Sequence, residues 1–352
     1  MTVDNHIKKY FSCKLTSGGF CCAYNTIYKR EPDSRVYILN DGDDLERAVF
    51  FDRLIKNLSG YSLTAFNPFY DDGADGIYIE NLNTYILSDG GYNRIAPVIP
   101  GIWEKFISIS GDKSYSPPLK EEIILRRTKE NGHYKKACEA LKRASFIREK
   151  LHSEVSAHLN DDKAINFMRR FCARTFRDEI QSGTGVIRLL SSATPLGIHT
   201  HYDTIFSMCE KTVDIQDETG FAAAIIAGVI KDYAANEKIP FIMSPAYFSG
   251  VIPQFLIFPA TGTAVTVSDG NHILPFEPAE KISASRFING DAVSWEKIKI
   301  LIDVENRLLE KCVTEIYAGR EERFAASAAV GDYSDTQKAE ENADKFAELL
   351  IN

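Results

Sequence analysis

The sequence has no long apolar segment and no paired cysteine motif. No apolar run approaches the roughly 18–20 residues that a membrane-spanning helix needs. Its first ten residues lack the apolar core of a signal peptide. The seven cysteines are odd in number and include no C-x-x-C pair, a pattern typical of reduced thiols. These absences predict a cytoplasmic protein that has no membrane partner.

The chain also has fewer basic than acidic residues, which limits the classes of macromolecule that it is expected to bind. The chain has 41 Lys and Arg against 49 Asp and Glu, and its formal net charge is −8. This balance argues against a dedicated nucleic-acid binder. The 44% of hydrophobic and 26% of charged residues are those of an ordinary globular protein. With 352 residues the chain exceeds the usual size of one domain, so we expect two.

An internal duplication is the clearest feature that is present. The segment G-F-C-C-A-Y-N-T-I-Y begins at Gly19, and G-I-H-T-H-Y-D-T-I-F begins at Gly197, 178 positions later. The tripeptides 88–90 and 268–270 both read Ser-Asp-Gly and continue the match. The repeat predicts two halves with the same fold, and each half serves as a control on the other.

Both halves show the same order of expected elements. A short strand (20–28; 198–206) precedes an apolar strand (35–39; 212–215), a polar loop and a helix with apolar residues at i, i+3, i+4 and i+7. Further strands follow the helix (61–66, 76–79 and 84–87; 240–243, 255–258 and 264–267). Strand–helix–strand order with short connections predicts right-handed parallel units. The predicted fold class is therefore α/β, with two homologous parallel-sheet halves.

A helical composition separates the two halves. The stretch from Pro117 to about Gln181 is rich in Lys, Arg, Glu and Ala, and predicts one long helix over about 119–159 and a further helix. It could be a solvated connector or an arm that binds a partner. Two more helices are expected at about 293–317 and 337–350. The expected organisation is a first half (1–116), a helical insertion (117–181), a second half (182–290) and C-terminal helices (291–352).

The loop that precedes the helix of each half is where a phosphate-binding loop would lie. The motif G-x-x-x-x-G-K-[ST] supplies backbone amides, a lysine and a hydroxyl to a phosphate and Mg²⁺. The first loop has Glu46, Arg47 and Ala48 at the second-glycine, lysine and hydroxyl positions, and the second loop has three alanines there. The two loops read Asp41-Gly42-Asp43-Asp44-Leu45-Glu46-Arg47-Ala48 and Asp217-Glu218-Thr219-Gly220-Phe221-Ala222-Ala223-Ala224.

Acidic side chains in the first loop oppose a bound triphosphate. Each like-charge pair costs a few kcal/mol even at an effective dielectric constant of about 20. Asp43 or Asp44 can instead cap the helix N-terminus, in place of a phosphate. A cation site in the acidic loop is one alternative, and nucleotide binding is another. Nucleotide binding would use Asp41, Gly42, Asp43, Asp44 and Arg47 in the first loop, or Asp217, Thr219 and Gly220 in the second.

Four elements carry a resemblance to a known family, and the first is Y-I-L at 37–39 with the loop and helix that follow it. N-P-F-Y-D-D-G-A-D-G-I-Y-I-E-N-L, I-L-S-D-G-G-Y-N-R-I-A-P-V-I-P-G and R-L-L-S-S-A-T-P-L-G-I-H-T-H-Y-D-T-I-F resemble an uncharacterised bacterial tandem P-loop ATPase-like family. The resemblance spans roughly residues 8–290. It implies two P-loop NTPase-fold halves joined by a helical insertion, with ATP and Mg²⁺ as ligands. The family's acidic residue at the end of a later strand would be Asp89, and by the repeat Asp269, although S-D-G is also a turn signature.

A histidine pair in the second half is the competing candidate site. His199 and His201 alternate on an expected strand, which places both imidazoles on one face, as in metal-dependent hydrolases. Asp203 could orient one of them. The first-half equivalents are Cys21 and Ala23, so the pair is not part of the shared scaffold. A half-buried histidine pair without a ligand is the simpler interpretation.

These observations favour a degenerate ATPase-like protein that is not catalytic. We expect a binding or regulatory module that needs no cofactor and that pairs with itself or with an intact relative through its helical segment. One alternative is a nucleotide-binding ATPase with a non-standard loop, using ATP and Mg²⁺. The other is a metal-dependent hydrolase centred on His199 and His201.

Overall fold

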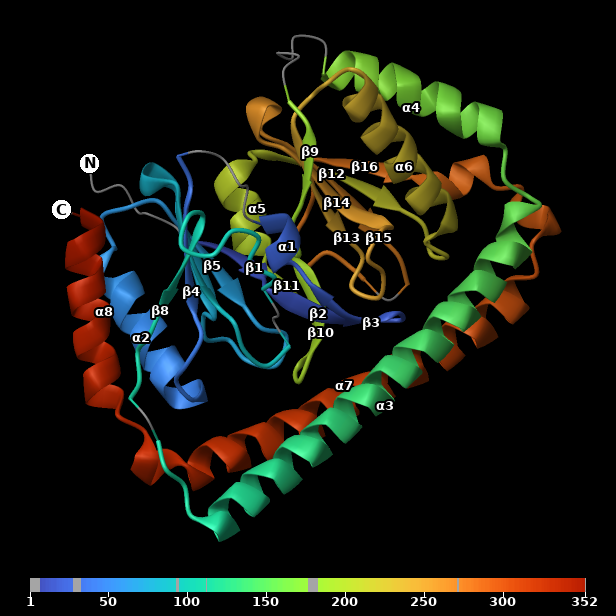
Figure 1. Cartoon of the computed structure of the whole chain (residues 1–352). Helices are drawn as coiled ribbons and strands as arrows, with labels where there is room; N and C mark the ends of the chain where they lie inside the picture. Colours follow the sequence, from blue (N-terminus) through green and yellow to red (C-terminus); the bar gives the residue numbers. More distant parts are fainter. Residues whose placement is uncertain are drawn as a thin grey trace.

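The computed structural model describes residues 7–27, 33–92, 95–111, 113–176, 183–270 and 272–351. It is an α/β protein with two similar six-stranded sheets (Figure 1). The first sheet has the order β1-β5-β6-β7-β4-β8, and the second has the order β9-β13-β14-β15-β12-β16. The first comprises β1 (Lys8–Phe11), β4 (Arg35–Leu39), β5 (Leu63–Asn67), β6 (Gly76–Ile79), β7 (Thr84–Ser88) and β8 (Glu104–Ile107). The second comprises β9 (Gly185–Ile187), β12 (Lys211–Gln216), β13 (Phe241–Pro245), β14 (Pro253–Phe258), β15 (Thr263–Ser268) and β16 (Glu280–Ser283).

The expectation of wholly parallel sheets is wrong, because both sheets are mixed. β5 pairs antiparallel with β6, and β6 pairs antiparallel with β7; β13, β14 and β15 do the same. No α-helix separates these strands, and a short connection cannot carry the chain back for a parallel pairing. Asn83, in the left-handed conformation at φ 44°, closes the tight turn between β6 and β7.

Two of the expected strands are also too long. In the structure the two strands are β3 (Gly19–Cys22) and β11 (Gly197–Thr200). Each is the second strand of a hairpin, with β2 (Cys13–Thr16) and β10 (Ser191–Thr194) as the first strands. The chain then forms helices where we expected strand, in α1 (Tyr24–Ile27) and α5 (Tyr202–Met208). Long-range contacts decide this: the Thr204 hydroxyl accepts from the Lys9 amide and donates to the Lys9 carbonyl. Position 28, the expected end of the first strand, lies outside the described residues.

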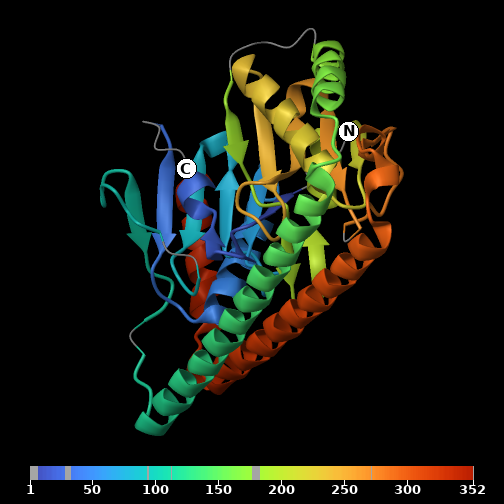
Figure 2. The same ribbon diagram turned by 90° about the vertical axis from the view of Figure 1, so that its right-hand side faces the viewer.

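Two long helices lie side by side along one edge of the molecule. α3 (Pro117–Ser156) and α7 (Trp295–Ala329) run together in both views (Figures 1 and 2). Their buried positions match when the two helices are offset by 175 residues. The matched pairs include Glu130 with Glu305, Tyr134 with Leu309, Ala137 with Cys312, Leu141 with Ile316, Ala144 with Gly319, Arg148 with Arg323 and Leu151 with Ala326. The duplication therefore extends through the helices, beyond the sheets.

The shorter helices α4 (Asp161–Thr175) and α8 (Thr336–Ile351) match at the same offset. Asn160 caps α4 by accepting from the Lys163 amide, and Asp335 accepts from the Lys338 amide before α8. The segment expected as an insertion, 117–181, thus holds α3 and α4, and these have counterparts in α7 and α8. Its expected boundary, at 181 and 182, lies outside the described residues.

α4 and α8 are the last helices of the first and the second copy of the repeat, and each packs against the sheet half of the other copy. α8 packs its buried face on α2 (Asp44–Asn57) in the first half, and α4 packs on α6 (Phe221–Asn236) in the second (Figure 1). Ala343 and Ala347 are buried in the core that contains Phe51 and Leu54 of α2. The two halves are therefore interlocked. In the described part of the chain, no helix has both the length and the apolarity needed to cross a bilayer.

Candidate functional site

The N-terminus of α2 is closed by the chain's own carboxylates. Asp43 is the N-cap residue: its Oδ1 accepts from the Glu46 amide at 3.0 Å, and Glu46 Oε2 accepts from the Asp43 amide at 3.0 Å. Lys113 lies 2.6 Å from Asp43 Oδ2 and 2.7 Å from Glu46 Oε2. The capping box and its lysine occupy the place of a phosphate at this helix end.

The second loop is closed in a different way. Asp217, buried before α6, accepts from the amides of Thr219, Ala222 and Ala223 at 3.0, 2.7 and 3.3 Å. Gly220 takes the left-handed φ of 71° that this tight turn requires. One carboxylate therefore binds the amides that a phosphate would need.

The remaining loop carboxylates make local contacts. Asp41 Oδ1 accepts from the Ile109 amide at 2.8 Å. Asp89 Oδ1 accepts from the Ile95 amide at 3.1 Å, as in a turn. Asp269 forms a 2.6 Å ion pair with Arg148 of α3.

A buried charge network links the first loop to the long helices. Arg323 of α7 bonds Asp44 at 2.7 Å and Glu130 of α3 at 3.0 Å, and its guanidinium lies 4.2 Å from the centre of the Tyr70 ring. Burial raises the pKa of Asp44, but the charges of Arg323 and Arg127 outweigh it and lower the pKa.

The second half has a related network. Arg148 of α3 bonds Asp269 and Glu305 of α7, both at 2.6 Å. Arg148 and Glu305 are the repeat equivalents of Arg323 and Glu130. Each arginine thus connects the long-helix pair to a loop of one sheet.

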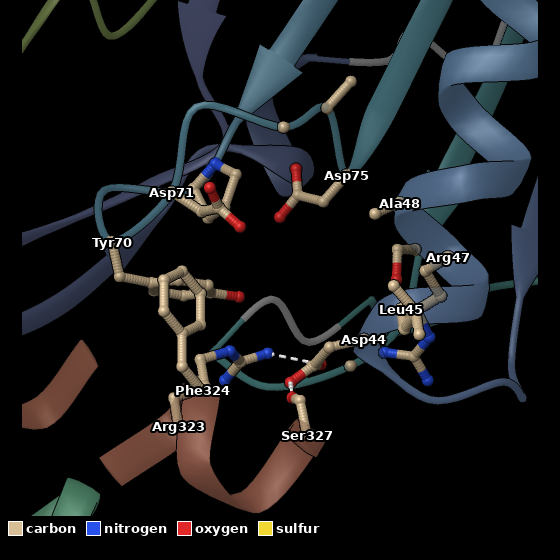
Figure 3. A pocket seen from close by; sticks show the side chains of 15 residues that line it. Asp44, Leu45, Arg47, Ala48, Tyr70, Asp71, Asp75, Arg323, Phe324 and Ser327 are labelled. Atoms are coloured by element: carbon tan, nitrogen blue, oxygen red, sulfur yellow. Dashed lines mark hydrogen bonds and ion pairs between the residues drawn. The ribbon is translucent and has the colours of Figure 1, made fainter. Parts of the chain in front are cut away.

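A cavity of about 200 Å³ lies beside the first network, and Figure 3 shows its lining. Its walls come from the start of α2, the β5–β6 loop and α7. Asp71 and Asp75 lie at one end of it, and the Asp44–Arg323 pair lies at the other. Arg47 and Ala48 of α2 form one side, with Tyr70 and Phe324 opposite.

Asp75 is the most perturbed acid of this cavity. Tyr24 donates a 2.9 Å hydrogen bond to its Oδ1, and Ser12 donates a 3.0 Å hydrogen bond to its Oδ2. Burial raises the pKa of the carboxyl to about 7, against the hydrogen bonds from Tyr24 and Ser12, which lower it. A carboxyl that titrates near neutrality in a cavity is typical of a functional site.

The guanidinium of Arg47 lies next to Gly90. Its Nε donates to the Asp41 carbonyl at 3.0 Å, and within the described residues it has no ion-pair partner. A Cβ on Gly90 would fall 1.8 Å from Arg47 Nη1, so only glycine leaves room for the guanidinium. The S-D-G tripeptide 88–90 thus provides a surface for Arg47 in addition to a turn.

The second half lacks counterparts of Arg47, Asp71 and Asp75. Residues 222–224 of α6 are the repeat equivalents of residues 46–48, which include Arg47, and all three are alanine. The segment 249–254 before and into β14 contains no carboxylate, whereas the first half has Asp71 and Asp75 before β6. The cavity chemistry therefore belongs to one copy only. Sequence reasoning missed Asp75 and Arg323, because no motif marks them.

The histidine pair lies at the junction of the two halves. His199 is on β11, and His201 is at the N-cap position of α5, where its side chain makes no capping hydrogen bond; their ring centres are 5.0 Å apart. Burial, together with the charges of the neighbouring His199 and Lys9, lowers the pKa of His201 to about 3. Asp203 is in the first turn of α5. Within the described ranges, no three His, Cys, Asp or Glu side chains gather closely enough to hold a metal ion.

Comparisons with known proteins give no relative: no family model, no curated protein and no solved structure matches this chain.

Proposed function

We propose that the chain is a binding or regulatory module without ATPase activity, and that the first-half cavity holds its ligand, a small molecule. The observation that carries the proposal is the closure of both helix N-termini. Asp43 with Lys113, and Asp217 by itself, take the places that phosphates occupy in a P-loop protein. A nucleotide would have to displace groups that already satisfy these helix ends.

The asymmetry between the halves supports the choice of site. Arg47, Asp71 and Asp75 line one cavity in the first copy, and the sequence of the second copy has no such charges at the equivalent positions. The scaffold does not need these charges, since the second half folds around a similar sheet without them. Charges that are dispensable for folding and face a cavity are best explained by a ligand.

Titration with ATP–Mg²⁺, followed by calorimetry and by the melting temperature, tests the first part. A ligand at about 100 times its Kd stabilises a protein by about 2.7 kcal/mol. Micromolar binding would therefore raise the melting temperature measurably at about 1 mM ATP. We expect no heat of binding and no shift in melting temperature. Micromolar binding of ATP–Mg²⁺ would overturn the proposal.

A pair of matched variants tests the second part. Ala48→Phe fills the cavity, and Ala224→Phe places the same side chain on the equivalent helix of the second half. Any ligand of the protein should lose its stabilising effect with Ala48→Phe and keep it with Ala224→Phe. The opposite pattern would place the site elsewhere. Elemental analysis of the purified protein, with His199→Ala as control, tests the metal-hydrolase alternative.

A further inference from the structure

We infer that the ligand of the first-half cavity is a small zwitterion with one ammonium group and one carboxylate, the chemistry of a free amino acid. The inference rests on the function proposed above and deepens it. It follows from the opposite charges that the cavity presents at different places on its wall (Figure 3).

The acidic end of the cavity suits an ammonium group. Asp71 and Asp75 both come from the β5–β6 loop and lie at the same end (Figure 3). The Asp71 carboxylate accepts from the Asp72 amide at 2.7 Å, and in the described part of the chain it has no ion-pair partner. An ammonium has three donors and no acceptor, so the Asp71 carboxylate complements it.

The cationic side suits a carboxylate. Only Nε of the Arg47 guanidinium is used, by the Asp41 carbonyl, which leaves both terminal NH₂ groups available. A planar guanidinium binds a carboxylate with two parallel hydrogen bonds. Arg323 cannot serve in this way, because Asp44 and Glu130 already hold it. The lack of a Cβ on Gly90 leaves room for the guanidinium at this position.

The size and the remaining walls limit the rest of the ligand. The cavity volume is about 200 Å³, smaller than the cavities of roughly 300–1,000 Å³ that hold drug-sized molecules. Leu45, Ala48, Pro68 and Phe324 give it apolar surface between the charged ends. A short aliphatic zwitterion fits these walls, whereas a nucleotide or a peptide is too large.

A thermal-shift and calorimetric titration tests the inference. The probes are glycine, alanine, serine and β-alanine, with propylamine and propionate each carrying one of the two charged groups. We expect saturable stabilisation by at least one zwitterion, and at least about tenfold weaker binding of the amine and of the acid. Binding of propylamine or propionate as tight as that of every zwitterion would overturn the inference. So would the absence of saturable zwitterion binding up to about 10 mM.

Variants assign the two charges. Arg47→Gln and Asp71→Asn should each weaken zwitterion binding about 10- to 100-fold, because each removes one charge-assisted interaction. Lys56→Gln removes a charge from the exposed face of the same helix and should leave affinity unchanged. Equal affinity of Arg47→Gln and the unaltered protein would refute the role of the guanidinium. Urea unfolding of each variant shows that the fold is kept.

Gly90→Ala provides an independent test of the guanidinium position. The added methyl group would displace Arg47, so it should weaken binding as much as Arg47→Gln does. Different results would refute the zwitterion ligand and the proposed function. A ligand of another class that is lost with Ala48→Phe would refute the zwitterion and keep the site. Binding of ATP–Mg²⁺ would refute the proposed function itself.

Discussion

Replacing Asp75 by asparagine should change how the stability of the protein depends on pH. The folded carboxyl has a pKa of about 7, whereas its ordinary value is 3.8. Between pH 4 and pH 7 the folded protein therefore keeps a proton that the unfolded chain has released. The free energy of unfolding must fall as pH rises through this interval, and it stays low above pH 7.

The size of the effect follows from the difference between the two pKa values. Full expression of that difference corresponds to about 4 kcal/mol. The cavity keeps the carboxyl in partial contact with solvent, so we expect about 2–4 kcal/mol. Asparagine has nearly the same shape, remains neutral and can still bond Tyr24 and Ser12, whose hydroxyls donate or accept.

The assay is urea unfolding of the unaltered protein and of Asp75→Asn at pH 5, 6, 7 and 8. Between pH 5 and pH 8 the variant should gain about 1–2.5 kcal/mol of stability relative to the unaltered protein, because part of the full effect already develops below pH 5. Arg47 and Arg323, whose charges lower the pKa of Asp75, stay ionised throughout, so they do not produce the slope. A stability difference that is the same at pH 5 and pH 8 would refute the reasoning.

Three further outcomes follow from the structure. Burial lowers the pKa of Lys14 to about 7, below its unfolded 10.5, so stability should rise with pH from about 7 to 10; Lys14→Met should remove this rise in urea midpoints. Arg323→Met should destabilise the protein by about 3 kcal/mol in urea unfolding, because the buried Glu130 then keeps, among the described residues, only Arg127 as an ionic partner, and adding Glu130→Gln should recover part of the loss. Cutting the chain within 177–182 should give two pieces that co-purify in a 1:1 ratio when expressed together, whereas each piece alone should fail to give a cooperative transition. A stable folded piece on its own would contradict the interlocked packing.

Much of the fold could be predicted from repetition and periodicity. The strands ending at Leu39 and Ser88, the helix over Asp44–Asn57 and the long helix from Pro117 lie where the pattern indicated. The edge strands β1, β8, β9 and β16 were missed, because they are short and have no strong alternation. The direction of β6 was also missed, since periodicity reports a strand but not its partner.

The candidate site was harder to predict for a physical reason. Asp75 acquires its raised pKa only through burial beside Tyr24 and Ser12, which are 51 and 63 positions away. Arg323 reaches the first loop because α7 packs against α3, and no local motif indicates this. Composition did identify the acidic loop, and Asp43 caps the helix there, as one of the two residues considered for that role.

The packing of each copy's helices against the sheet half of the other copy has a consequence for symmetry. Arg323, Phe324 and Ser327 of the cavity wall come from the second repeat, although the rest of the lining comes from the first. Two identical chains arranged in this way would have to present two identical cavities. One chain that contains both copies is free of that requirement: it can keep charges on one side and replace them with alanine on the other. Joining the two copies in one chain thus allows a nearly two-fold symmetric fold to carry one ligand site instead of two.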